Sequence, residues 1–334
     1  MQAVQTPFPF LMTQPISADY SPLVVVLGPT GSGKSELALS LAENLSGEIV
    51  NCDSIQVYKG LDIGSAKTPV DHRRGIPHHL LDVIGPDEEL SAGSYARMAR
   101  QVVGEIQARA HIPIVAGGTG FYLRALLDGL SPAPNRDRQL RERLQQIESR
   151  RANALHRMLR RYDPLAAARI HPNDIPKLIR AIEIMSLSGE TTTQAQSAPR
   201  QAFSGIGAVK LGLSPDRKLL YSRLNDRTAG LFANGLIEET RRLLQLGYAP
   251  DSKPMQSLGY KQAVQVIFGK LSVDSAIAEC QIKTRQYAKR QVTWFRAERN
   301  VHWIDGLGSD VDVQQAALQH TITFLSNFGR KWMN

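Results

Sequence analysis

The chain has 334 residues, of which 42% are apolar and 21% are charged, as in an ordinary globular protein. Its 40 lysines and arginines outnumber 31 aspartates and glutamates, which gives a formal net charge of +9. No apolar run approaches the roughly 20 residues that a membrane-spanning helix needs. The two cysteines, Cys52 and Cys280, lie too far apart in sequence to suggest a cysteine zinc site. We therefore expect a cytoplasmic protein with reduced thiols and no contact with a membrane.

Residues 1–21 have neither the basic start nor the long apolar stretch of a secretory signal, and we expect a disordered leader. Patterns typical of strands and helices then alternate. Residues 22–28 (PLVVVLG) are a short β-branched run that predicts a buried parallel strand. Residues 34–44 have helical spacing, and residues 47–53 and 111–120 predict two further strands. This alternation predicts an α/β fold, a P-loop NTPase-like parallel sheet flanked by helices.

The sequence SPAPN at residues 131–135 interrupts this pattern. We expect residues 22–130 to form the first part of the core and residues 131–200 to be an inserted α-helical domain. Residues 201–334 would then complete the core. Within them, residues 207–217 predict a strand that returns to the sheet, and only helices are expected after it.

Positive charge is concentrated in two segments. Residues 131–161 contain nine arginines against three acidic side chains, and residues 283–299 contain six basic side chains against one glutamate. Such clusters favour a polyanionic partner such as nucleic acid. Solvated helix faces would give the same pattern, so the clusters alone do not decide the partner.

The residues directly after the first predicted strand match the phosphate-binding pattern G-x-x-x-x-G-K-[ST]. They are Gly28, Pro29, Thr30, Gly31, Ser32, Gly33, Lys34 and Ser35. The glycines let backbone N–H groups face phosphate oxygens at the start of a helix. Lys34 would reach the terminal phosphates, and the Ser35 hydroxyl would ligate Mg²⁺. The pattern alone predicts bound ATP or GTP.

The other parts of a nucleotide hydrolase are incomplete. Such an enzyme needs an apolar strand that ends in an acid, which holds the metal ion. The third predicted strand instead ends in AGGTG, and the base-reading motif N-K-x-D of G proteins does not occur. Asp53 follows the second strand, so a metal-holding role stays open for it. Alternatively, Asp53 and Ser54 only cap a turn by bonding to the backbone.

Seven motifs occur in order between about residues 22 and 300. They are the phosphate loop, DSIQVYKGLDIGSAK, PHHLLDVIGPDEELSAGSY, GGTGFYLRALLDGL, RIHPNDIPKLIRAIEI, QSLGYKQ and KRQVTWFR. With this set the sequence resembles the tRNA dimethylallyltransferase family, also called tRNA isopentenyltransferases. The lack of a C-terminal zinc-finger extension makes it similar to the bacterial members.

The resemblance implies transfer of a dimethylallyl group from dimethylallyl diphosphate to N6 of the adenine next to the anticodon, position 37. The implied tRNAs read codons beginning with U, and the products are N6-dimethylallyladenosine and diphosphate. The phosphate loop would then hold a leaving diphosphate, assisted by Mg²⁺ as cofactor. Asp53 would accept the proton of the attacking N6.

The resemblance also implies further site residues. Thr119 would be a catalytic residue beside Asp53 and would contact the tRNA near the reacting base, although it also suits a helix N-cap. One of Arg223 and Arg227, a helical turn apart, would reach the diphosphate. In the first basic segment, residues 131–161, Arg141 is the residue that we expect to contact the tRNA. The full set implied for the tRNA anticodon stem-loop is Asp53, Ser54, Ile55, Gln56, Thr119, Arg141, Pro176, Lys177, Leu178, Ile179, Arg180, Gln256, Ser257, Leu258, Gly259, Tyr260, Lys261, Arg285, Lys289, Arg290 and Arg296.

Two other function classes remain open from the sequence. A P-loop kinase would transfer phosphate from ATP to a small molecule or nucleoside and would need no RNA. A non-catalytic RNA-binding switch gated by nucleotide would bind tRNA without forming a covalent product. Among these classes we expect the prenyltransferase, acting as a monomer, with ATP as a competing ligand of the loop.

Overall fold

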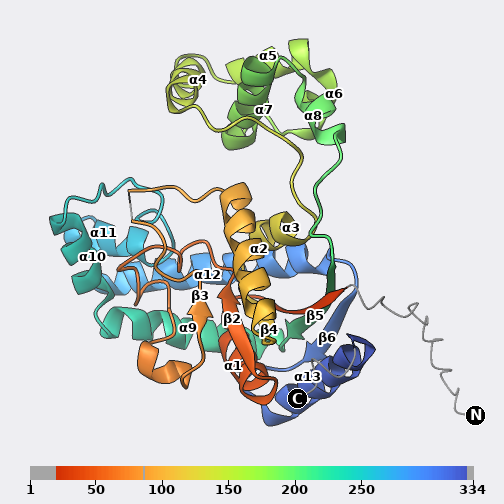
Figure 1. Cartoon of the computed structure of the whole chain (residues 1–334). Helices are drawn as coiled ribbons and strands as arrows, with labels where there is room; N and C mark the ends of the chain where they lie inside the picture. Colours follow the sequence, from red (N-terminus) through yellow and green to blue (C-terminus); the bar gives the residue numbers. More distant parts are fainter. Residues whose placement is uncertain (1–19, 86, 329–334) are drawn as a thin grey trace, which may run out of the picture. The chain divides into compact units, whose positions relative to one another are not determined.

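The computed structural model describes residues 20–85 and 87–328 (Figure 1). The expected leader, residues 1–21, lies almost wholly outside them. The chain forms two compact units: one is Leu127–Ala202, and the other combines the segments before and after it. The predicted insertion, residues 131–200, lies within the first of these. Among the described residues, no helix has the length and apolar character needed to cross a membrane.

A six-stranded sheet with the order β3-β2-β4-β1-β5-β6 forms the centre of the larger unit. The strands are β1 (Ser21–Leu27), β2 (Gly47–Asn51), β3 (His78–His79), β4 (Ile112–Ala116), β5 (Ile206–Ser214) and β6 (Val301–Asp305). All neighbouring strands run parallel. The predicted parallel α/β sheet is therefore confirmed.

Two edge strands depart from the sequence-based expectation. β6 corrects the prediction that only helices follow the returning strand, because it pairs with β5 from Lys210↔Val301 to Ser214↔Asp305. Its sequence VHWID has one buried side chain, Ile304, so no apolar run marks it as a strand. β3 consists of two histidines beside β2 and is too short to leave a pattern.

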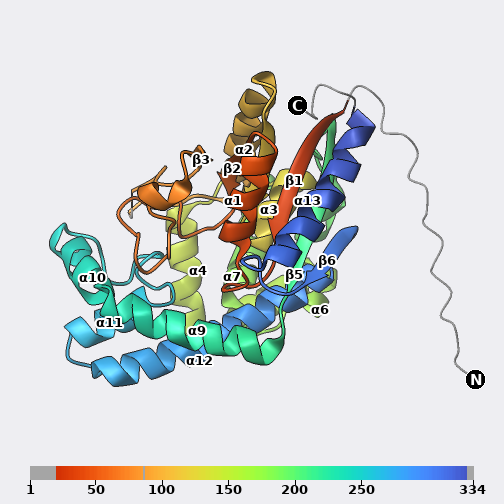
Figure 2. The same cartoon turned by 90° about the horizontal axis from the view of Figure 1, so that it is seen from below.

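Helices cover both faces of the sheet. In the larger unit the helices are α1 (Lys34–Asn44), η1 (Val70–Arg73), α2 (Ala92–Ala108), α3 (Gly120–Leu127, whose last residue belongs to the smaller unit), α9 (Arg217–Ala233), α10 (Leu236–Gln245), α11 (Tyr260–Ile267), α12 (Val273–Arg296), α13 (Val311–Leu325) and η2 (Ser326–Phe328). α1 and α13 share one core with inward side chains of the strands, and α2 lies on the opposite face (Figures 1 and 2). α9 to α12 pack against one another, and α9 also contacts α12, which is distant from it in sequence (Figure 2).

The smaller unit is a cluster of short helices with its own core. Its helices are α4 (Arg138–Arg150), α5 (Ala154–Tyr162), α6 (Pro164–Arg169), α7 (Ile175–Ser188) and α8 (Thr192–Ser197). Leu144, Leu155, Leu159 and Leu178 from three of these helices pack together. Asp163 caps α6 and also bonds to Thr193, which ties α6 to α8.

A buried carboxylate joins three chain segments at the edge of the sheet. Glu48 on β2 is 3% exposed and bonds to His79 Nε2 at 2.6 Å, His111 Nδ1 at 2.7 Å and Arg109 Nη2 at 2.9 Å. Burial by itself would raise the pKa of Glu48, but the hydrogen bonds from Arg109, His79 and His111 outweigh it and lower the pKa to about 2.

We expect the substitution Glu48→Gln to lower the free energy of unfolding by about 2 to 3 kcal/mol at pH 7. Because the folded pKa is depressed, this stability is present above the unfolded pKa of about 4.3. It is lost as the pH falls toward 2. Urea unfolding of both proteins at pH 7 and pH 3 measures the difference, which should fall to about half at pH 3. An equal difference at both pH values would contradict the assignment.

Candidate active site

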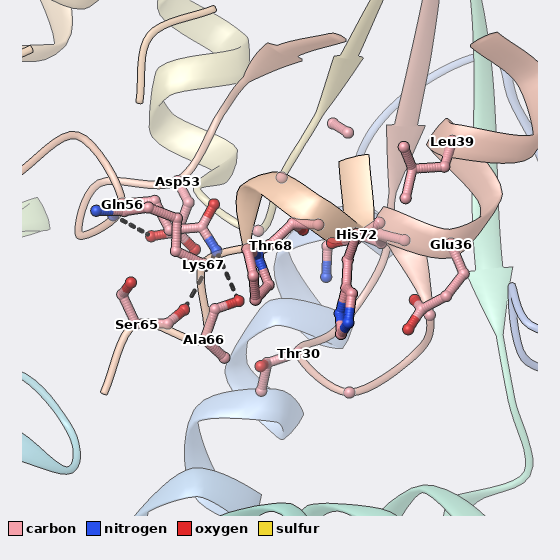
Figure 3. Close-up of a pocket in the computed structure, with 18 of the residues that line it drawn as sticks. Thr30, Glu36, Leu39, Asp53, Gln56, Ser65, Ala66, Lys67, Thr68 and His72 are labelled. Carbon is pink, nitrogen blue, oxygen red and sulfur yellow. Dashed lines mark hydrogen bonds between the residues drawn. The ribbon is translucent and has the colours of Figure 1, made fainter. Parts of the chain in front are cut away.

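The carboxyl ends of β1, β2 and β4 meet at one edge of the sheet, where ligands bind in open parallel sheets. A cavity of about 700 Å³ lies there and is lined by the phosphate loop, the segment after β2 and α9. We call it the phosphate-loop cavity. Figure 3 shows Asp53, Gln56 and Ser65 on one side of it and Glu36 on the other.

The phosphate loop has the backbone geometry that anion binding needs. Gly31 and Gly33 have φ of 78° and 87°, which disfavour residues with a side chain. A Cβ at Gly33 would also lie 2.7 Å from Gly308 N. The first helical bond of α1 runs from Leu37 N–H to Gly33 O, so the amides of the preceding turn lie at the positive end of the helix.

Two cations of this cavity are desolvated. Burial lowers the pKa of Lys34 to about 8, although the nearby Asp53 carboxylate opposes the shift. Burial also lowers the pKa of Arg227, again against the attraction of Asp53. Lys34 Nζ donates to Pro29 O at 2.8 Å, and Arg227 Nη1 donates to Thr30 Oγ1 at 3.4 Å. Among the described residues no carboxylate pairs with either cation within 4.0 Å, so an anionic ligand would compensate the buried charge.

The pKa of Lys34 predicts a pH dependence of anion binding. The protonated amine attracts a diphosphate, so affinity should be full below pH 8 and fall as Lys34 loses its proton above it. We expect the Kd of dimethylallyl diphosphate, measured by calorimetry without tRNA, to rise up to about tenfold per pH unit above pH 8. Lys34→Met should bind weakly with a flat profile, whereas Lys59→Met, at an exposed site, should keep the wild-type profile. A flat profile for the wild-type protein would disprove this assignment.

The two carboxylate oxygens of Asp53, which lines the cavity, differ in their contacts. Its Oδ1 accepts the N–H groups of Ile55 at 2.8 Å and Gln56 at 3.4 Å. The turn-capping alternative raised by the sequence is therefore present in the structure. No described residue donates a hydrogen bond to Oδ2, so capping leaves this oxygen free to act as a base. The next residue, Ser54, donates its N–H to Thr119 Oγ1 at 3.0 Å.

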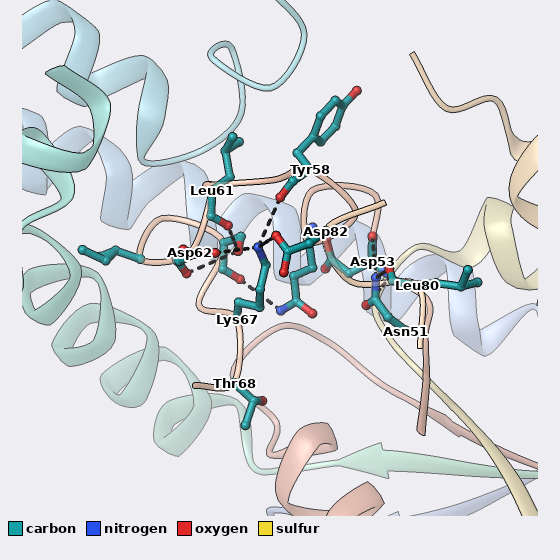
Figure 4. A network of polar contacts seen from close by, with 12 residues as sticks. Asn51, Asp53, Tyr58, Leu61, Asp62, Lys67, Thr68, Leu80 and Asp82 are labelled. Carbon is teal, nitrogen blue, oxygen red and sulfur yellow. Dashed lines mark hydrogen bonds and ion pairs between the residues drawn. The ribbon is translucent and has the colours of Figure 1, made fainter. Parts of the chain in front are cut away.

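The segment after Asp53, part of which lines the cavity, is held by the buried charged side chains of Lys67 and Glu239. Lys67 Nζ donates to Asp62 Oδ1 and Asp82 Oδ1, both at 2.6 Å, and to Tyr58 O at 3.2 Å (Figure 4). The Glu239 carboxylate of α10 accepts the N–H groups of residues 62, 63 and 64. These contacts fix a loop that has no regular secondary structure of its own.

A second cavity of about 430 Å³ adjoins the first. Asp53, Thr30, Ser65 and Arg227 line both. Its remaining wall is more apolar and comes from α9, α12 and the segment before α11, with Leu224, Leu231, Cys280 and Tyr287 among its residues. We call it the helical cavity. A molecule with a charged end and a small apolar group could therefore lie across Asp53, with each end in a suitable environment.

Comparisons with known proteins agree with this arrangement. The sequence profile described as IPP transferase matches residues 56–298. A tRNA dimethylallyltransferase of Solibacter usitatus is 53% identical over 91% of this chain and 99% of its own length. The chain belongs to the IPP transferase family.

Solved structures of similar proteins extend the comparison. The tRNA isopentenylpyrophosphate transferase of Bacillus halodurans is 34% identical, with a TM-score of 0.67 over 93% of this chain and 97% of that one. A eukaryotic dimethylallyltransferase acting on tRNA is 28% identical, with a TM-score of 0.77 over 92% of this chain and 80% of that one. The resemblance drawn from the seven motifs is thus confirmed, and the IPP transferase family shares this fold.

Not all residues predicted to bind the diphosphate line the phosphate-loop cavity. Ser32 is fully buried, and Gly28 and Pro29 form the base of the loop. Arg223 and Arg227 both line it, but Arg223 is held by Ser309 Oγ at 3.2 Å and Glu36 at 3.7 Å. Thr119 lines neither cavity, and its hydroxyl accepts the Ser54 amide.

The residues predicted for tRNA contact in the larger unit differ in exposure. Gln256, Ser257 and Leu258 line the helical cavity, and Lys261, Lys289, Arg290 and Arg296 are exposed. Tyr260 is buried and donates its hydroxyl to Glu239 at 2.5 Å. The Arg285 guanidinium bonds to Asn225 Oδ1 on α9.

The residues predicted for tRNA contact in the smaller unit also differ in exposure. Leu178 and Ile179 are buried in its core, whereas Lys177 is exposed and pairs with Asp174. Pro176 stands in the first turn of α7. Arg141 and Arg180 both pair with the buried carboxylate of Glu183, at 3.2 and 2.6 Å. Side-chain contact with RNA is thus open to only some members of each predicted segment.

Sequence reasoning missed several residues of the site. Leu231, Cys280, Thr284 and Tyr287 line the helical cavity, and Lys67 holds the loop above the phosphate-loop cavity. Lys67 is the last residue of the motif DSIQVYKGLDIGSAK, so the sequence did carry a signal for this position. The other four residues lie on α9 and α12, with the helical spacing of ordinary core residues. Only the packing of α9 against α12 brings them together.

Proposed function

We propose that this protein transfers the dimethylallyl group of dimethylallyl diphosphate to N6 of an adenine in tRNA. One observation carries the proposal: Asp53 lies where a cationic cavity meets a more apolar one, with one carboxylate oxygen free. The names of the relatives support the same reaction. Phosphoryl transfer is less well supported, because β4 ends at Ala116 with glycines and no metal-holding acid follows it.

In this reaction the diphosphate lies against Lys34, Arg227 and the first-turn amides of α1. The C–O bond of the ester breaks, and its electron pair stays on the bridging oxygen of the leaving diphosphate. Charge therefore grows on the group that the two cations face, and stabilisation of developing charge lowers the barrier. The allylic carbon tolerates partial cation character, so assistance to the leaving group has a large effect.

Adenine N6 attacks the same carbon and loses one proton as the new C–N bond forms. Its lone pair is delocalised into the ring, which makes N6 a poor nucleophile until a base accepts that proton. The free oxygen of Asp53 is the proposed acceptor, with the other held by the amides of Ile55 and Gln56. Positioned base catalysis of this kind contributes about 10² to 10⁴ in rate.

The donor set fits a magnesium ion. The Ser35 hydroxyl is exposed to the phosphate-loop cavity, and Mg²⁺ binds such an oxygen together with phosphate oxygens and water. When bound there, the ion would supply further neutralisation of the leaving diphosphate. Ser35 is the residue proposed to hold it.

The tRNA details follow from the family resemblance. The proposed acceptor is adenine 37, beside the anticodon, in tRNAs that read codons beginning with U. A stacked base must leave the loop to reach the cavity, at a cost of a few kcal/mol that is smaller in a single-stranded loop. The two basic segments, residues 131–161 and 283–299, support binding of the anticodon stem-loop. The family resemblance implies a monomer, and the tRNA substrate supports a cytoplasmic location.

Incubation with tRNA, Mg²⁺ and dimethylallyl diphosphate tests the proposal. After digestion to nucleosides, mass spectrometry should find an adenosine in which one dimethylallyl group has replaced a hydrogen. The same incubation with labelled ATP should transfer no phosphate. Phosphate transfer without the prenylated nucleoside would favour a kinase, and tRNA binding without any product would favour an RNA-binding switch.

A further inference from the structure

A buried amide lies between the loops of the active site and has no part in the reaction steps above. Gln291 of α12 is 6% exposed. Its Oε1 accepts the N–H of Thr30 at 2.8 Å, and its Nε2 donates to Gly118 O at 2.8 Å. A backbone N–H can only donate and a carbonyl can only accept, so the orientation of the amide is fixed by its partners.

The two partners belong to the two halves of the proposed site. Thr30 is in the phosphate loop, and its hydroxyl accepts from Arg227. Gly118 precedes Thr119, whose hydroxyl accepts the amide next to Asp53. One side chain thus connects the loop for the diphosphate with the contacts that lead to the base.

The sheet does not make this connection by itself. β1 and β4 pair as far as Val26↔Ala116, followed by a bond from Gly117 N–H to Val26 O at 3.4 Å. Beyond that bond, Gln291 provides the hydrogen-bonded link between the two loops among the described residues. Gly118 also leaves room for the Gln291 side chain, because a Cβ at residue 118 would lie 2.3 Å from Gln291 Nε2.

We propose that Gln291 is a positioning residue of the transfer reaction. By holding Thr30 and Gly118 together, it sets the separation between the bound diphosphate ester and Asp53. The inference rests on the proposed function. Misplacement of reacting groups by about 1 Å costs about 100-fold in rate, even when both substrates still bind.

The variants Gln291→Met and Gly118→Ala test this from the two ends of the link. Methionine keeps the volume but offers neither the donor nor the acceptor, and the new methyl group at residue 118 displaces the amide. We expect kcat at saturating substrates to fall about 10- to 100-fold in each. The Kd values of tRNA and of dimethylallyl diphosphate alone should stay within about threefold. Both variants break the same hydrogen-bonded link. The kcat of the double variant should therefore be only slightly lower than the kcat of the more impaired single variant.

The matched control is Gln281→Met on the same helix, where the amide donates to Asn225 O of α9 at 3.1 Å and touches neither loop. Its kcat should stay within about twofold of the wild-type value. A wild-type kcat in Gln291→Met would overturn the inference, and so would a loss that merely follows the folded fraction in thermal unfolding. If Gln291→Met does not fold, Gly118→Ala decides by the same criteria. A wild-type protein that forms no prenylated tRNA would overturn the proposed function as well, which separates the two failures.

Discussion

Replacing Asp53 by asparagine is expected to slow prenyl transfer about 10² to 10⁴-fold while both substrates still bind. Asparagine keeps an oxygen that can accept the N–H groups of Ile55 and Gln56, so the turn should persist. The free carboxylate oxygen is replaced by an amide group that cannot take a proton from adenine N6. The change therefore removes the base and preserves the surrounding backbone.

Single-turnover rates and separate tRNA binding measurements check this expectation. Asp226→Asn, an exposed acid on α9, is the matched control and should keep the wild-type rate. We expect the Kd of tRNA for Asp53→Asn to change by less than about threefold. A loss of tRNA binding as large as the loss of rate would make Asp53 a contact residue and not the base.

Replacing Arg227 by glutamine is expected to lower kcat about 10² to 10³-fold, the effect of removing one group that stabilises developing charge. Arg227 lines both cavities beside Asp53 and pairs with no carboxylate among the described residues. Arg223 instead shares its charge with Glu36 and contacts Ser309. Arg223→Gln should therefore cost less than about tenfold, although the two arginines are one helical turn apart.

The pair of variants separates leaving-group assistance from general electrostatics, because each removes one positive charge from the same cavity. Steady-state kinetics with saturating tRNA supply kcat and the KM for dimethylallyl diphosphate. Equal losses in the two variants would mean that only the net charge of the cavity matters. A larger loss for Arg223→Gln would assign the diphosphate to the other arginine.

The sequence predicts those parts of the fold whose structure is determined by residues close together in the chain. β1, the phosphate loop and α1 follow one another within 24 residues, from Ser21 to Asn44, and each has its own pattern. The turn at Asp53 was likewise readable because its hydrogen bonds span two or three residues. In contrast, β6 has one buried side chain, and its pairing with β5 decides its structure.

The site was less predictable, because its contacts join distant parts of the chain. Gln291 bonds to partners 261 and 173 residues away, and no periodicity reports such a contact. Motif resemblance identifies a segment but not the direction of its side chains. Leu178, Ile179 and Tyr260 therefore fell within segments assigned to tRNA, although packing buries them. Arg285, which was also assigned to tRNA, is bonded to Asn225.

The central claim is that the phosphate loop assists the departure of a diphosphate through C–O cleavage. Dimethylallyl diphosphate with oxygen-18 at the bridging position tests it directly, in the presence of tRNA. Cleavage of the C–O bond predicts that all of the label is found in released diphosphate and that the tRNA gains the prenyl group without it. Label in dimethylallyl alcohol, with no mass gain on the tRNA, would mean cleavage at phosphorus and would contradict the account.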